Sequence, residues 1–190
     1  NNYTSNTNLN DSSVNVISGT GGLTKTGSSR LDLMDSQLTY TGTTTISNGT
    51  LRTGSANNLS DSTRVSVLSA GTYDVNHSDT IGSIDGAGTI DIASGVTLTA
   101  GSGADRTFSG LLNGAGNFSK SGSGTLTLSG TNTYTGSTTI NAGTIDVSGQ
   151  LNSGNYAGAI ANSGTFTFSS DSDQTLSGDI SGDGALTKSG

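Results

Sequence analysis

The 190-residue chain contains no cysteine, proline, tryptophan or glutamate. Without cysteine it has no disulfide framework, no thiolate metal site and no cysteine nucleophile. The absence of proline suits continuous strand pairing, because proline removes a donor from the hydrogen-bond ladder between strands. A chain of this length can gain its stability from a continuous stacked core instead of from disulfides.

Positive charge is also scarce. Seven Lys and Arg residues face fourteen Asp residues, which gives a formal net charge of −7. Nucleic acids and anionic membranes require clustered basic residues, so we expect no nucleic-acid partner. No apolar run approaches the roughly 18 residues of a membrane-spanning helix, and no signal peptide is visible, so we expect no direct membrane insertion by this segment. The polar start over residues 1–13 and the end within a repeat at Gly190 favour a piece of a longer protein.

What the chain does have is a short repeat, a Gly-Thr-apolar triplet that recurs about every twenty residues. With two degenerate members, Arg30-Leu31 and Thr107-Phe108, the apolar positions lie 17 to 22 residues apart. A fixed period of this length is typical of repeat architectures. The clearest copies are Gly49-Thr50-Leu51, Gly71-Thr72-Tyr73, Gly88-Thr89-Ile90, Gly124-Thr125-Leu126, Gly143-Thr144-Ile145, Gly164-Thr165-Phe166 and, loosely, Gly184-Ala185-Leu186.

Short strands account for most of the chain. Segments such as Leu126-Thr127-Leu128 and Ile145-Asp146-Val147 alternate apolar and polar residues, and helix signals are nearly absent. About twenty such segments, two to three per period, favour a solenoid over a sandwich. Residues 1–190 are therefore predicted to form one all-β segment, a right-handed parallel β-helix of about nine to ten coils of ~19–20 residues. Gly and Asn are expected at its corners.

A longer repeat overlies the short one. Units near residues 19–51 and 114–147 match each other, and residues 182–190 open a partial third copy. All three begin with G-x-G-x-apolar-x-K-x-G. The two full units also share Y-T-G-x-T-T-I-x-x-G-T followed by an apolar residue.

These units resemble the autotransporter-associated β-strand repeat, whose pattern is roughly G-x-G-x-L-x-K-x-G-x-G-T-L-x-L-x-G-x-N-x-Y-x-G-x-T-x-I-x-x-G-T-L. Residues 114–147 follow it almost throughout. Residues 19–51 follow it with one inserted residue and with Asp35-Ser36-Gln37-Leu38 in place of S-G-x-N-x. The resemblance covers about 75 of the 190 residues.

The resemblance implies the passenger of a bacterial type V secretion protein. Such a passenger is a right-handed β-helix exported through an outer-membrane β-barrel, which this chain lacks, and displayed on the cell surface. Many passengers of this kind mediate adhesion, aggregation and biofilm formation. The repeat itself is linked to secretion and folding of the passenger.

Lys25, Lys120 and Lys188 recur at one motif position. They have two interpretations: contacts to an acidic ligand, or solvated lysines on a strand face that protect the sheet. We favour the second, because the three lie in separate copies.

His77, the only histidine, lies near Asp74 and Asp79 and is a weak metal or acid–base candidate. We favour a surface loop residue. Asp171 and Asp173 could form half of a Ca²⁺ loop, but Ca²⁺ needs about six oxygens and the surrounding motif lacks the Asp of calcium-binding solenoids. We therefore predict no catalytic, cofactor-binding or metal-binding residue, and no cofactor.

Three further groups have a structural interpretation as the favoured one. Gly86-Ala87-Gly88 superficially resembles a phosphate loop but lacks the following helix, so a coil corner is expected. Tyr40 and Tyr134 are expected to pack on flanking turns. Threonines predicted to point outward form hydroxyl ladders that either bind a partner or simply suit an exposed strand. They are Thr43, Thr44, Thr45, Thr125, Thr127, Thr138 and Thr139.

Three functions from different classes remain open. The favoured one is an adhesin or self-association module that acts through a lateral polar face, with identical passengers on neighbouring cells, or a host or matrix protein or glycan, as partners. The second is a passive stalk that promotes folding and secretion. The third is a polysaccharide-cleaving enzyme, which the scattered Asp residues disfavour. An ice-binding solenoid is disfavoured by the variable coil length. Any segment-specific site is expected within residues 52–85 or 148–181, which depart most from the motif.

Overall fold

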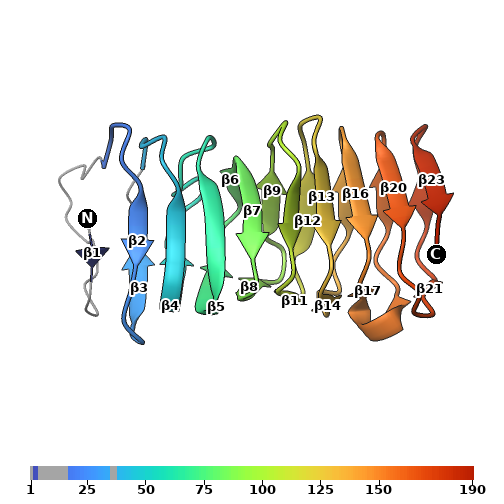
Figure 1. Ribbon diagram of the computed structural model, residues 1–190, viewed down its shortest axis with the longest axis horizontal. Helices are drawn as coiled ribbons and strands as arrows, with labels where there is room; N and C mark the ends of the chain where they lie inside the picture. The colour runs from blue at the N-terminus through green and yellow to red at the C-terminus, as the bar shows by residue number, and fades with distance from the viewer. Residues whose placement is uncertain (1, 4–16, 35–37) are drawn as a thin grey trace.

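The computed structural model describes residues 2–3, 17–34 and 38–190. Across these residues, short strands stack rung upon rung along one long axis, with the N-terminal end at one extreme and the C-terminal end at the other (Figure 1). Every strand pair recorded among them is parallel. The helical structure described is one 3-10 turn, η1 (Asn152–Gly154), and no described helix has the length and apolarity needed to span a bilayer.

Each coil visits three stacks of strands in turn, which we call faces 1, 2 and 3. Face 1 comprises β2 (Leu23–Lys25), the first halves of β4 (Thr44–Thr53) and β5 (Arg64–Val75), β7 (Ser83–Gly86), β10 (Arg106–Phe108), β13 (Thr125–Leu128), β16 (Thr144–Val147), β20 (Thr165–Phe168) and β23 (Ala185–Lys188), with β1 (Asn2–Tyr3) beside β2. Face 2 comprises β3 (Arg30–Leu33), the second halves of β4 and β5, β8 (Thr89–Ile92), β11 (Leu111–Gly114), β14 (Thr131–Asn132) and β17 (Gln150–Leu151).

Face 3 comprises β6 (Asp79–Ile81), β9 (Thr97–Ala100), β12 (Asn117–Lys120), β15 (Thr138–Ile140), β19 (Ile160–Asn162) and β22 (Ile180–Ser181). A short separate pair joins β18 (Asn155–Tyr156) to β21 (Thr175–Leu176). The predicted all-β parallel solenoid is thus confirmed. The number of coils is slightly lower than predicted, at about eight turns instead of nine to ten. Some coils are longer than the predicted ~19–20 residues, as where Gly86 pairs with Phe108, and much of residues 1–22 lies outside the described part.

The core is a continuous column of aliphatic and aromatic side chains. Alternate residues of each strand point inward, so Leu51, Tyr73 and Ile90 stack on successive rungs of face 2 and are fully buried. The corners need glycine where rungs approach closely. A Cβ on Gly110 would lie 2.0 Å from the carbonyl oxygen of Gly88, and one on Gly130 would lie 2.0 Å from that of Gly110. Space at the corner, rather than backbone conformation, requires these glycines.

The triplets do not form one stack, contrary to the single series of positions that the sequence predicted. The triplets at 49–51, 71–73 and 88–90 lie on face 2, whereas those from 124–126 onward lie on face 1. The longer repeats shift in the same way, because Gly19 and Gly114 begin copies that are 95 residues apart, which is not a whole number of coils of about 20 residues. The same motif therefore folds on different faces.

Candidate functional site

The repeated lysines are part of the fold and not of a binding surface. Lys25 and Lys120 are 2% and 3% exposed, so the prediction of solvated surface lysines is wrong for both. Lys25 Nζ donates to the carbonyl oxygens of Thr26, Gly27 and Asn48 at 3.0, 2.7 and 3.0 Å. The ammonium groups are thus spent on turn carbonyls, and contact with an acidic ligand is excluded for these two.

The same local structure recurs one copy later on another face. Lys120 Nζ donates to Ser121 O at 2.9 Å and Gly122 O at 2.6 Å, and burial lowers the pKa of Lys120. Lys188, on the last rung, is exposed and donates to Gly190 O at 2.6 Å. The motif lysine therefore closes the turn that follows its own strand.

The repeated tyrosines are also internal. Tyr134 is fully buried, and its hydroxyl lies 2.6 Å from Thr138 Oγ1, which in turn lies 2.7 Å from the hydroxyl of Tyr156. Tyr40 pairs with Thr44 in the same way. Thr44 and Thr138 are therefore inward, and the prediction that they point outward is wrong. The other predicted outward threonines are half-exposed, namely Thr43, Thr45, Thr125, Thr127 and Thr139.

The acidic residues near His77 do not converge on it. Asp79 points into the core, 1% exposed, and its Oδ2 accepts from the Tyr73 hydroxyl at 2.6 Å. Asp74 lies on the outer side of β5, where Oδ2 is 3.3 Å from Arg52 Nε. Because burial disfavours its charged form, the pKa of Asp79 rises to about 7.

The remaining candidates lie at corners and loops. Gly86 has φ +108° and, as predicted, forms a corner, with the N–H groups of Ala87 and Gly88 both donating to Val67 O at 2.9 Å. Asp173 follows β20, and its backbone carbonyl accepts from Gln150. In the described ranges, no three His, Cys, Asp or Glu side chains are placed to hold one metal ion. The replaced segment at 35–37 lies outside the described residues.

Face 1 presents one straight row of outward side chains. The registers place hydroxyl residues side by side over most rungs, interrupted by two aspartates, and the predicted ladder of hydroxyls is thus present. A second row of Thr125, Thr144 and Thr165 runs beside it. The main row consists of Thr24, Thr45, Ser66, Asp85, Thr107, Thr127, Asp146, Thr167 and Thr187.

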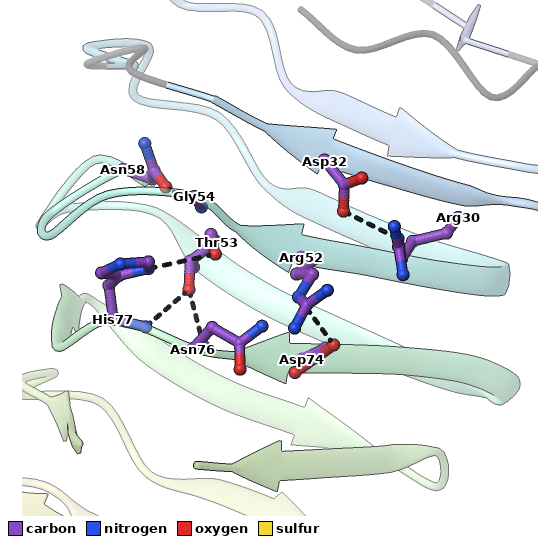
Figure 2. Close-up of polar contacts among 9 residues, drawn as sticks. All are labelled: Arg30, Asp32, Arg52, Thr53, Gly54, Asn58, Asp74, Asn76 and His77. Atoms are coloured by element: carbon purple, nitrogen blue, oxygen red, sulfur yellow. Dashed lines mark hydrogen bonds and ion pairs between the residues drawn. The ribbon is translucent and has the colours of Figure 1, made fainter. Parts of the chain in front are cut away.

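Face 2 instead carries charge and an open groove (Figure 2). Its outward positions on successive rungs are Asp32, Arg52, Asp74 and Asp91. Arg30 Nε lies 2.8 Å from Asp32 Oδ1 within β3. The groove, about 500 Å³ in volume, is lined by Arg30, Asp32, Met34, Arg52, Thr53, Gly54, Asn76 and His77.

Buried Thr53 ties the two walls of this groove together. Its Oγ1 accepts from the N–H groups of Asn76 and His77 at 2.9 and 3.1 Å, and its carbonyl lies 3.4 Å from His77 Nδ1. When the Asn76 amide is oriented with its oxygen toward Arg52, that oxygen accepts from the guanidinium. Sequence reasoning placed His77 on the surface, where it lies, but missed the groove, because its residues come from three different coils.

Together, these features define a polar parallel β-solenoid with elongated lateral faces. Residues 23–52 and 118–147 match the family described as the passenger-associated-transport-repeat. Over 140 residues, 70% of this chain, the sequence is 35% identical to the Adhesin BmaC autotransporter of Brucella suis biovar 1 (strain 1330). The chain spans about 4% of the length of that relative. No solved structure matches.

The chain belongs to the autotransporter passengers and carries two of their repeats. The two matched ranges coincide with the units predicted from the sequence at 19–51 and 114–147. A passenger of this class has a surface or secreted location tied to the outer membrane.

Proposed function

We propose that this segment is an adhesive module that self-associates through face 1, so that passengers on neighbouring cells hold the cells together and promote biofilm formation. The observation that carries the proposal is the unbroken outward row of face 1, from Thr24 to Thr187. Its hydroxyls donate and accept hydrogen bonds, so two copies of the row complement each other. Each contact is weak, and repetition along the rod supplies avidity. The similarity to a protein named an adhesin supports this role.

The test is a clumping assay with bacteria that display the whole passenger. Thr127→Asp with Thr167→Asp places two carboxylates on face 1, two rungs apart, on a chain of net charge −7. Like charges opposed across an interface repel, so we expect clumping to be lost. The matched control is Thr99→Asp with Thr139→Asp, which makes the same change two rungs apart on face 3 and should leave clumping intact. Equal clumping by all variants would refute the proposal.

A passive scaffold is the second candidate, and one observation favours it. The repeat copies containing Lys25 and Lys120 lie on different faces, and each lysine closes its own turn. Copies arranged in this way stabilise the rod locally but do not build a common ligand surface. If this role is the whole function, Lys120→Ala lowers the amount of passenger on the surface, while the face 1 variant changes neither display nor clumping.

We propose further that the segment acts without catalysis. The aspartates that an enzyme would have to gather are dispersed, with Asp79 in the core, Asp85 on face 1 and Asp91 on face 2. Glycoside hydrolysis needs two carboxyl groups that flank one bond. Incubation with polysaccharides should therefore release no new reducing ends, and release above that of a buffer control would contradict the proposal.

A further inference from the structure

The groove on face 2 gathers positive charge on an acidic chain. Its lining holds two guanidinium groups and the only imidazole against one carboxylate, that of Asp32. Most other basic side chains are committed elsewhere. Lys25 and Lys120 donate to turn carbonyls, and Arg64 and Arg106 both lie within 4 Å of the Asp85 carboxylate, at 3.3 and 3.9 Å.

The two groove arginines are held in place but remain accessible. Each uses Nε for its ion pair, Arg30 with Asp32 and Arg52 with Asp74. The Arg30 and Arg52 side chains are still 52% and 37% exposed. An oriented guanidinium presents parallel N–H donors that match the two oxygens of a carboxylate.

The walls of the groove are fixed before any ligand arrives. Thr53 is 1% exposed and fastens the chain after β5 to the end of β4 through the N–H groups of Asn76 and His77. Gly54 lies so close to the preceding rung that a Cβ there would be 2.7 Å from the carbonyl oxygen of Leu33. A groove already ordered in this way loses little conformational entropy on binding.

We propose that this groove binds a carboxylate-bearing saccharide, such as a uronic or sialic acid unit within a glycan. Arg30 and Arg52 receive the carboxylate. The polar groups beside them, from Asp32, Asn76 and His77, provide donors and acceptors for sugar hydroxyls. This inference goes beyond the self-association proposed above and uses a different face of the rod.

Other classes of ligand fit the groove less well. β4, which runs along it, is paired on both sides by β3 and β5, so a peptide cannot bind there by adding a strand. The lining includes no aromatic side chain and one apolar side chain, Met34, so the buried anchors typical of peptide interfaces are missing. The net charge of −7 opposes binding of a polyanion as long as a nucleic acid.

An NMR titration of the ¹⁵N-labelled chain tests the inference. The probes are glucuronic acid and 3′-sialyllactose, with glucose and lactose as neutral counterparts, acetate as the bare carboxylate and tri-aspartate as an acidic peptide. We expect the two acidic saccharides alone to shift the amide signals of Thr53, Asn76 and His77. The double variant Arg30→Gln with Arg52→Gln should bind them at least about tenfold more weakly.

The matched control is Arg64→Gln with Arg106→Gln, which removes the same charge from face 1 and should bind like the unmodified chain. Equal loss in both double variants would overturn the inference, as would equal shifts with acetate, the neutral sugars or tri-aspartate, or no shift with any probe. The face 1 variant Thr127→Asp with Thr167→Asp should keep saccharide binding, and the groove variant should keep clumping. Failure of the groove inference is therefore read separately from failure of self-association.

Discussion

Asp79 is a carboxyl group inside the solenoid, and its replacement by asparagine should reverse the effect of pH on stability. Oδ2 accepts from the Tyr73 hydroxyl at 2.6 Å and, at 3.4 Å, from the N–H of Leu59, while Oδ1 has no hydrogen-bond partner among the described residues. Burial, together with the Asp61 charge, raises the pKa of Asp79 from 3.8 to about 7. Folding therefore favours the protonated form.

The sign and size follow from the two pKa values. Between pH 4 and 7 the folded chain binds a proton at Asp79 that the unfolded chain lacks, so this contribution is fully present below about pH 4 and is lost as pH rises through 7. The separation of about three pH units, at 1.36 kcal/mol per unit, corresponds to about 4 kcal/mol. Asp79→Asn keeps an acceptor for Tyr73 and does not titrate. At pH 8 the variant should therefore be more stable than the unmodified chain, and at pH 4 the two should be similar.

Urea denaturation followed by circular dichroism, at intervals from pH 4 to 9, measures this difference. The difference between the two chains isolates Asp79 from the other carboxylates, which titrate in both. Asp146→Asn, an outward aspartate on face 1, is the control and should follow the pH dependence of the unmodified chain. Parallel pH curves for Asp79→Asn and the unmodified chain would show that the buried carboxyl is not linked to folding.

Three further substitutions test the interior by urea denaturation at pH 7. Lys120→Ala removes a buried stem and leaves turn carbonyls without their donor, so it should cost about 2–4 kcal/mol; no loss would mean that the ammonium group is not needed. Gly130→Ala places a Cβ 2.0 Å from a carbonyl oxygen and should cost about 1–3 kcal/mol, whereas Gly21→Ala, with nothing within 4 Å, should change stability by less than about 0.5 kcal/mol; equal effects would disprove the crowding argument. Tyr134→Phe removes the hydroxyl that bonds Thr138 and should cost about 1 kcal/mol, and an unchanged midpoint would count against that bond.

The period and the alternation were enough to predict the fold class. The alternation in Leu126-Thr127-Leu128 states which side chains face the core, and both leucines are buried. The spacing states that equivalent strands stack in parallel, and Leu126 does pair with Ile145. The motif also indicated the family, because it fixes many positions within one local unit.

Side-chain burial in the turns was harder to predict. A lysine in a strand is ordinarily exposed, because burying an isolated ammonium group is costly. Lys25 is buried because the carbonyls of Thr26, Gly27 and Asn48 converge on it, and Asn48 belongs to the next coil. Thr44 was likewise predicted to be outward, whereas it bonds the hydroxyl of Tyr40 in the core.

The sequence by itself determined that this chain is a stack of parallel strands with glycine-rich corners, since those properties depend on residues within one coil. Only the tertiary structure decided which strands share a face. Face membership depends on the lengths of all intervening coils, and these vary from 19 residues, between Leu126 and Ile145, to 22, between Gly86 and Phe108. The groove at Arg30, Arg52 and His77 exists because three such coils place their outward residues side by side.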